Sequence, residues 1–209
     1  NVNFKYENRD QYVFKNFNFK IFKNEIIGLK GESGRGKTTL INIVMGLIRP
    51  TGGEILADEK NIHDNLDQWQ SNLGIVQQDN VLIDDTIKNN ITLRFHDEKF
   101  DQSKLLSSIK NSNLETFLKS LPNGINTIIG EKGAQISGGQ RQRICIARML
   151  YNEPEIIILD EATSGLDTKN EESILKFIKN LKGKKTIILV SHSTEALSIC
   201  DRVIDLNQI

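Results

Sequence analysis

The sequence has few cysteines, few prolines and no long apolar run. Its 209 residues include two cysteines and three prolines, which excludes a disulfide-rich scaffold and a proline-rich disordered chain. Cys145 and Cys200 form no CxxC pair and lie in apolar contexts, so we expect buried thiols rather than a disulfide. Because no run approaches the ~20 apolar residues that span a bilayer, and no signal-peptide pattern begins the chain, we expect a soluble chain.

The chain also lacks net charge. Lys plus Arg and Asp plus Glu both number 27, so no global field favours nucleic acid or an anionic membrane as a partner. Charged residues make up 26% and hydrophobic residues 38%, a composition typical of a folded globular protein. A chain of this length is long enough for one large domain or for a core with a small lobe.

Continuous apolar runs alternate with amphipathic patterns along much of the chain. The runs predict buried strands of a parallel sheet, at residues 25–31, 155–161, 184–192 and 201–206. The amphipathic patterns predict helices, at residues 37–47 and 170–181. Alternation of this kind, with right-handed crossovers, predicts an α/β fold with a mostly parallel sheet.

Two other sequence patterns interrupt this predicted core. Alternating polar and apolar residues at 2–6 and 17–21 predict an antiparallel strand pair, and short strands are expected at 54–56 and 73–78. From residue 79 to residue 151, polar helix-forming stretches replace the strands. We therefore expect one domain over 1–209. Its core, with an antiparallel β subdomain, is formed by 1–78 and 152–209, and a helical subdomain is inserted at 79–151.

The segment GESGRGKT at 31–38 fits the pattern GxxxxGK[ST] between a predicted strand and a predicted helix. Its glycines let successive N–H groups point at a phosphate chain, and the helix N-terminus adds its positive dipole end. Lys37 is placed to reach the β- and γ-phosphates, and the Thr38 hydroxyl to ligate Mg²⁺. The competing interpretation is a glycine turn that only joins strand to helix. The predicted nucleotide-binding residues here are Gly31, Ser33, Gly34, Gly36, Lys37, Thr38 and Thr39.

Polar side chains follow several predicted strands at the sheet edge where ligands bind in α/β folds. Asp160 and Glu161 end one buried run; the first is placed to hold Mg²⁺ and the second to polarise the attacking water. His192 ends the next run and is placed to contact the γ-phosphate. Gln78 is similarly placed for Mg²⁺ and that water, although its neighbour Gln77 is distinguished from it only by the motif. The competing interpretations are a helix-start acid for Glu161 and a structural histidine for His192.

A second glycine segment, ISGGQRQR at 136–143, also opens a predicted helix. Ser137 is a good N-cap, and the two glycines permit close approach of an anion. One triphosphate is not easily held by two loops on different lobes of one chain. The second segment is therefore predicted to serve the nucleotide of another copy in a twofold dimer.

In order and content these motifs resemble the ATP-binding cassette domain of ABC transporters, over essentially the whole chain. The resemblance rests on GESGRGKT (31–38) as Walker A, VQQ ending at Gln78 as the Q-loop, ISGGQ (136–140) as the signature, IIILDE (156–161) as Walker B, SGLD (164–167) as the D-loop and SH (191–192) as the H-loop. It implies a P-loop NTPase core that uses ATP and Mg²⁺. The ligands of the metal would be Thr38, Gln78 and Asp160, with Glu161, His192 and Gln78 as catalytic residues.

The same resemblance implies nucleotide contacts away from the phosphate loop. Residues of the signature and the D-loop would contact the partner copy's ATP; they are Ser137, Gly138, Gly139, Gln140 and Asp167. Tyr6 matches the aromatic residue that stacks on adenine in this family, with Tyr12 as the competitor.

Residues 84–91 and GEKG at 130–133 resemble segments of exporter-type cassettes. This likeness implies a homodimer or pseudo-twofold heterodimer on the cytoplasmic face of a membrane. Its transmembrane domain, fused N-terminally, would be contacted through the Gln78 loop and Glu131. A finer likeness points to bacterial lipid-linked oligosaccharide or polysaccharide flippases. The alternative is a soluble, non-transport ABC ATPase of the DNA-repair or ribosome-associated kind.

Overall fold

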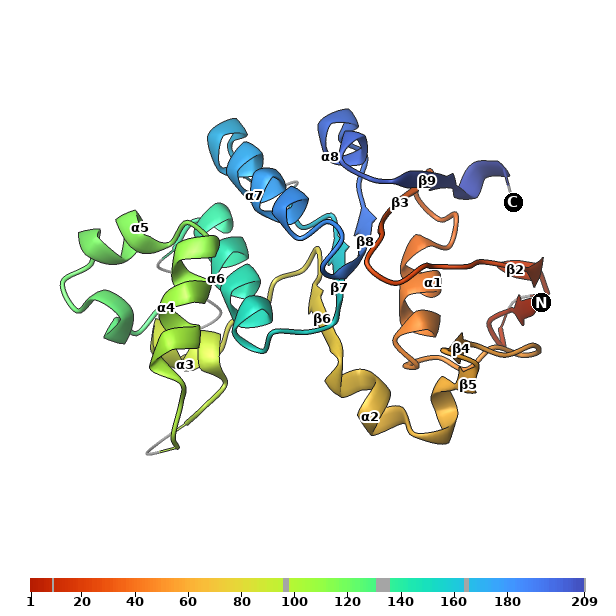
Figure 1. Cartoon of the computed structure of the whole chain (residues 1–209), viewed down its shortest axis with the longest axis horizontal. Coiled ribbons are helices and arrows are strands. Elements are labelled where there is room, and N and C mark those ends of the chain that lie inside the picture. Colours follow the sequence, from red (N-terminus) through yellow and green to blue (C-terminus); the bar gives the residue numbers. More distant parts are fainter. Residues whose placement is uncertain (9, 96–97, 131–135, 164–165, 209) are drawn as a thin grey trace. The chain divides into compact units, whose positions relative to one another are not determined.

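The computed structural model describes residues 1–8, 10–95, 98–130, 136–163 and 166–208 (Figure 1). The chain divides into two compact units. The first unit consists of Asn1–Leu73, Glu155–Ile158 and Gly183–Ile209, and the second of Gly74–Pro154 and Leu159–Lys182. Glu131, one of the predicted contact residues, lies outside the described residues.

A five-stranded sheet has the strand order β6-β7-β8-β3-β9. These strands span Leu73–Val76, Ile156–Asp160, Thr186–Val190, Ile26–Lys30 and Arg202–Asp205, respectively. In the first unit β3 is parallel to both neighbours, with Leu29 opposite Val190 on one side and Ile204 on the other. All five residues of β8 and the first four of β3 are buried. The predicted α/β fold with a parallel sheet is confirmed, and its apolar runs reflect burial on both faces.

The first unit also contains small antiparallel pairs and short helices. Strand β1 (Val2–Phe4) pairs with β2 (Phe14–Phe17), and β4 (Leu56–Ala57) pairs with β5 (Lys60–Asn61). The helical segments here are α1 (Lys37–Val44), η1 (Ile62–Asp64), α2 (Leu66–Ser71), α8 (Thr194–Ser198) and η4 (Leu206–Gln208).

The expectation of a strand at 17–21 is wrong by three residues. Strand β2 begins at Phe14 and ends at Phe17. These two rings are buried and stack at 4.9 Å between centroids. Asn16 has a left-handed φ of 51°, and the pairing with β1 is irregular. Because of this irregularity both rings lie in the core although they are three residues apart, which simple alternation does not predict.

The second unit consists mainly of helices. They are α3 (Ile87–Thr92), α4 (Gln102–Asn111), α5 (Glu115–Ser120), η2 (Gly124–Asn126), α6 (Gly138–Tyr151) and α7 (Thr168–Asn180). Helix α6 packs on α3 and α4. The buried apolar side chains of these three helices include Ile87, Ile91, Leu105, Ile109, Ile144, Cys145, Ile146 and Met149.

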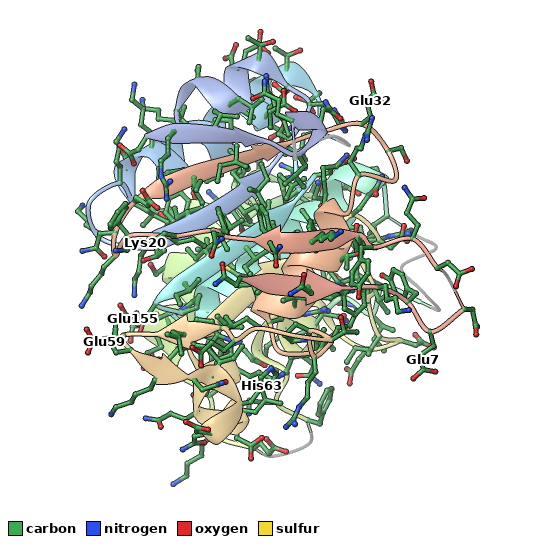
Figure 2. All side chains as sticks on the ribbon, turned by 90° about the vertical axis from the view of Figure 1, so that its right-hand side faces the viewer. Glu7, Lys20, Glu32, Glu59, His63 and Glu155 are labelled. Carbon is green, nitrogen blue, oxygen red and sulfur yellow. The ribbon has the colours of Figure 1, made fainter. Side chains whose placement is uncertain are left out.

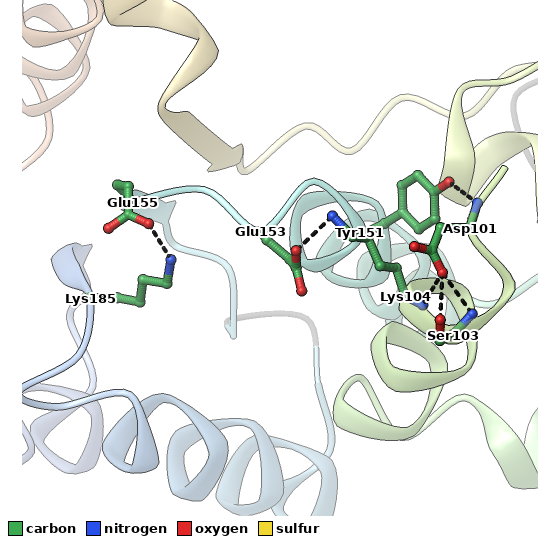
Figure 3. Close-up of polar contacts among 7 residues, drawn as sticks. All are labelled: Asp101, Ser103, Lys104, Tyr151, Glu153, Glu155 and Lys185. Atoms are coloured by element: carbon green, nitrogen blue, oxygen red, sulfur yellow. Dashed lines mark hydrogen bonds and ion pairs between the residues drawn. The ribbon is translucent and has the colours of Figure 1, made fainter.

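Polar contacts fix the C-terminal end of α6 against the start of α4 (Figure 3). Asp101 caps α4, and its own N–H donates to the Tyr151 hydroxyl at 2.9 Å. Lys104 forms an ion pair with Glu153 at 2.7 Å. In the first unit, Lys185 pairs with Glu155 at 2.9 Å (Figure 3). These exposed pairs contribute little each, but they mark where α6 ends and β7 begins.

Both cysteines are free thiols. Cys145 is buried and Cys200 is half-buried, as expected for small apolar residues without a disulfide between them. Among the described residues, no helix combines the length and apolarity needed to cross a membrane.

Candidate functional site

The first glycine loop joins β3 to α1. Gly34 and Gly36 have left-handed φ angles of 83° and 89°. Gly36 is the N-cap of α1, and no side chain of the described residues makes a capping hydrogen bond there. The first N–H groups of a helix need a partner outside the helix. The start of α1 therefore suits an anion, and the loop fits the triphosphate predicted for it.

Lys37, the first residue of α1, folds back over its own loop. Its Nζ donates to the carbonyl oxygens of Gly31 at 2.5 Å and Glu32 at 3.2 Å. The Nε2 atom of His192, two residues beyond β8, is 3.3 Å from the same Nζ. The structure thus brings together the lysine and the histidine that were predicted to meet the same phosphate.

The end of the chain supports this loop. The N–H of Glu32 donates to Oδ1 of Asn207 at 3.0 Å, and the Asn207 N–H donates to Asp205 at 3.0 Å. Asp205 also pairs with Lys30 at 3.3 Å. The Glu32 side chain itself is exposed and points away from the ribbon (Figure 2). Sequence reasoning missed Asn207, because nothing in the pattern links residue 207 to residue 32.

Tyr6 is attached to α1 by its hydroxyl. The Tyr6 hydroxyl and the Thr39 hydroxyl are 2.9 Å apart, and the Tyr6 ring meets Phe4 edge-on at 4.9 Å. Tyr6 as a whole residue is 39% exposed. Tyr12 is 44% exposed and has Lys5 at 5.8 Å from its ring centroid. Tyr6 is therefore fixed beside the residue that follows Thr38 and remains partly exposed.

In the second unit, Ser137 and Gln140 form a reciprocal capping box at the start of α6. The Gln140 N–H donates to Ser137 Oγ at 3.2 Å, and the Ser137 N–H donates to Gln140 Oε1 at 2.9 Å. A serine hydroxyl that accepts this bond keeps its own proton for donation. Apart from its chain neighbours and its own helix backbone, no described heavy atom lies within 4 Å of the position where a Cβ on Gly138 would be. The predicted anion-contacting residues therefore form an ordered, open helix start.

Glu161 directly follows β7 and has a left-handed φ of 52°, which is unusual for a residue other than glycine. The Gln142 side-chain amide lies 3.5 Å from its carbonyl oxygen. Gln142 is 3% exposed, and within the described part of the chain its Oε1 has no hydrogen-bond partner. Sequence reasoning missed Gln142, which connects the second glycine helix to the backbone of the predicted catalytic base.

Asp167 is the N-cap of α7. Its carboxylate accepts the Asn170 N–H at 3.0 Å and also the Asn170 side-chain amide. These two bonds, helped by the charge of Arg143, hold the pKa of Asp167 below its usual value. The carboxyl predicted to contact nucleotide is thus ionised and fixed in direction near neutral pH.

The predicted residues divide between the two units. The first unit holds Tyr6, Gly31, Ser33, Gly34, Gly36, Lys37, Thr38, Thr39 and His192, and the second holds Gln78, Ser137, Gly138, Gly139, Gln140, Asp160, Glu161 and Asp167. Gln78 is exposed after β6, and Asp160 is half-buried at the end of β7. No group of three or more His, Cys, Asp or Glu in the described ranges is arranged to hold a metal. The predicted donor set of one hydroxyl, one amide and one carboxylate suits Mg²⁺, which usually keeps waters and takes substrate phosphates as its other ligands.

Comparisons with known proteins identify the family and the fold. A family profile described as ABC transporter matches residues 14–164. The chain is 39% identical over 206 residues to ABC transporter B family member 13 of Arabidopsis thaliana, covering 98% of this chain and 16% of that protein. It is 38% identical over 204 residues to a putative multidrug export ATP-binding/permease protein of Staphylococcus aureus, covering 97% of this chain and 35% of that protein.

A solved structure is also similar throughout. A bacterial Atm1-family ABC exporter with ATP bound superposes with a TM-score of 0.92 and 33% identity, over 100% of this chain and 36% of that chain. The present chain thus spans well under half the length of each of these relatives.

Proposed function

This chain belongs to the ABC transporter family, and from that premise we propose that it is the ATP-binding and ATP-hydrolysing domain of a membrane exporter. The observation that carries the proposal is the phosphate loop, where an uncapped α1 start, Lys37 and His192 converge. The exporter assignment is supported by relatives named for export that match nearly the whole chain. The same relatives disfavour the soluble, non-transport alternative.

The residues would divide the chemistry as follows. Lys37 and the loop N–H groups bind the β- and γ-phosphates, and Thr38, Gln78 and Asp160 hold Mg²⁺. When bound, MgATP supplies the phosphoryl group whose transfer to water releases energy. Glu161 accepts the proton of that water, and His192 orients the terminal phosphate.

We further propose that two copies, or this chain and a pseudo-twofold relative, close head to tail over shared ATP. The open helix start at Ser137 would complete the site of the other copy. The relative named as an ATP-binding/permease protein supports a transmembrane domain in the same polypeptide. That domain would place this chain on the cytoplasmic face and meet it at the Gln78 loop and at Glu131. A lipid-linked oligosaccharide cargo stays a prediction.

Glu161→Gln tests the proposal. Removing the base should leave ATP binding intact and slow phosphate release by about 10²-fold or more, so that the closed dimer accumulates. Sedimentation velocity with saturating MgATP should show a dimer, and the same variant carrying Lys37→Ala should stay monomeric because it cannot hold the phosphates. A purely monomeric Glu161→Gln chain at saturating ATP would contradict the proposed closure.

A further inference from the structure

Arg143, on the second glycine helix, contacts three separate segments of the second unit. Its Nη1 donates to the Asn113 carbonyl at 3.0 Å and to Asn170 Oδ1 at 3.1 Å. Its Nε donates to the Gly139 carbonyl at 3.4 Å. One guanidinium therefore joins the loop between α4 and α5, the first turn of α7 and the first turn of its own helix.

Asn170 links Arg143 to Asp167 by hydrogen bonds. Its Oδ1 accepts from Arg143, while its main-chain and side-chain N–H groups both donate to the Asp167 carboxylate. Asn113 makes a second link to α7, because its side-chain amide donates to the Ser173 hydroxyl. The orientation of the Asn170 amide is thus determined by partners on both of its ends.

We propose that Arg143 is a positioning residue. It holds residues 137–140 and the Asp167 end of α7 as one surface, on which the ATP-driven pairing of two copies depends, while ATP binding by a single copy does not. The inference rests on the proposed function, since it needs pairing through these two segments. It adds a residue that is not among the predicted site residues.

The chemistry of the contacts requires arginine rather than a positive charge alone. A planar guanidinium presents donors in a fixed fork and serves three acceptors at once, whereas a lysine ammonium acts as a flexible point donor. Burial lowers the pKa of Arg143 and the charge of Asp167 opposes that effect, but a guanidinium stays protonated in proteins. Lysine in its place would keep the charge and lose the simultaneous contacts.

A merely structural role is the competing explanation, and α6 supplies a matched control. Arg148 donates from Nε to the Asn90 carbonyl at 2.7 Å, from Nη1 to the Val81 carbonyl at 3.0 Å and from Nη2 to Asn90 Oδ1 at 3.2 Å. To the part of the chain that the structure describes, it therefore makes as many side-chain hydrogen bonds as Arg143, from the same helix. These bonds reach α3 and its preceding loop instead of the start of α7.

The test compares Arg143→Lys with Arg148→Lys, each combined with Glu161→Gln in the full 209-residue chain. Affinity for a fluorescent ATP analogue should change by less than about twofold in both. The ATP-driven dimer should weaken about tenfold or more with Arg143→Lys, which corresponds to about 1.4 kcal/mol, and much less with Arg148→Lys. Equal weakening by both variants at matched thermal midpoints would overturn the inference.

Hydrogen exchange on the monomer separates this inference from the proposed function. Arg143→Lys should speed amide exchange at 138–140 and at 168–171 together, and Asn170→Ala should do the same from the acceptor side. Arg148→Lys should leave both segments protected. Unchanged exchange at 168–171 in Arg143→Lys would overturn the positioning role even if the Glu161→Gln chain dimerises. If the Glu161→Gln chain stays monomeric but Arg143→Lys speeds exchange at both segments, only the proposed pairing is contradicted.

Discussion

At the residue scale, the ammonium group of Lys37 is fixed by carbonyl groups of its own loop. The contacts with Gly31 and Glu32 keep the charge at the loop. A mobile lysine would lose much of its side-chain entropy on binding phosphate, and a lysine fixed in this way has less to lose. His192 extends the same arrangement from the end of the neighbouring strand β8.

Single substitutions can also decide whether Tyr6 or Tyr12 stacks on adenine. Tyr6→Ala should weaken ATP binding about two- to tenfold, because a stacked aromatic pair contributes about 0.5–1.5 kcal/mol. Tyr12→Ala should leave the affinity unchanged, and Tyr6→Phe should retain it because the ring remains and only the 2.9 Å contact with Thr39 is lost. Titration with a fluorescent ATP analogue measures all three. A larger loss with Tyr12→Ala would assign the stacking to Tyr12.

At the element scale, the phosphate loop depends on two glycines that have different surroundings. Gly36→Ala would place a Cβ 2.8 Å from Val13 and 3.0 Å from Phe14, whereas a Cβ on Gly34 would have no described heavy atom within 4 Å apart from its chain neighbours. Both positions have left-handed φ, which costs a non-glycine residue about 1–2 kcal/mol. Gly36→Ala should cost about 1–3 kcal/mol more by overpacking. Urea unfolding of both variants measures the difference, and equal losses would contradict the packing argument.

Prediction from sequence succeeded where a local pattern determines local structure. The strand, glycine loop and helix around Lys37 were predicted because adjacent residues determine the positive φ angles and the helix start. Ser137 was predicted as an N-cap because its residue type and its neighbours favour that position. Strand β2 was misplaced because an irregular pairing changes which residues face the core. Asn207 and Arg143 were missed because their partners lie far away in sequence, and only tertiary packing brings them together.

At the scale of the whole molecule, the predicted site residues belong to two compact units that the chain enters more than once. Family membership and the parallel α/β fold are confirmed, because ordered motifs and apolar runs along the sequence determine them. The roles of the site residues stay predictions, since each depends on a ligand. Those of residues 137–140 and Asp167 also depend on a second copy. Which copy supplies the phosphate loop and which supplies residues 137–140 can therefore be tested only in the assembled pair.

Two inactive variants, Lys37→Ala and Ser137→Arg, should restore ATPase activity when they are mixed. In a head-to-tail pair each site combines the phosphate loop of one copy with residues 137–140 of the other. A mixed pair then has one site with both defects and one site with neither. One intact site in each mixed pair should raise activity well above that of either variant alone. If all pairs formed equally readily, about half would be mixed and roughly a quarter of the wild-type activity would return at equal amounts.

Phosphate release at constant total protein, measured while the ratio of the two variants changes, should peak at equal amounts. Lys37→Ala mixed with Glu161→Gln is the control, because both residues are proposed to serve the same site and every mixed pair keeps a defect in each site. That mixture should stay inactive at all ratios. Recovery in the control, or no recovery with Ser137→Arg, would mean that residues 137–140 do not complete the site of the other copy.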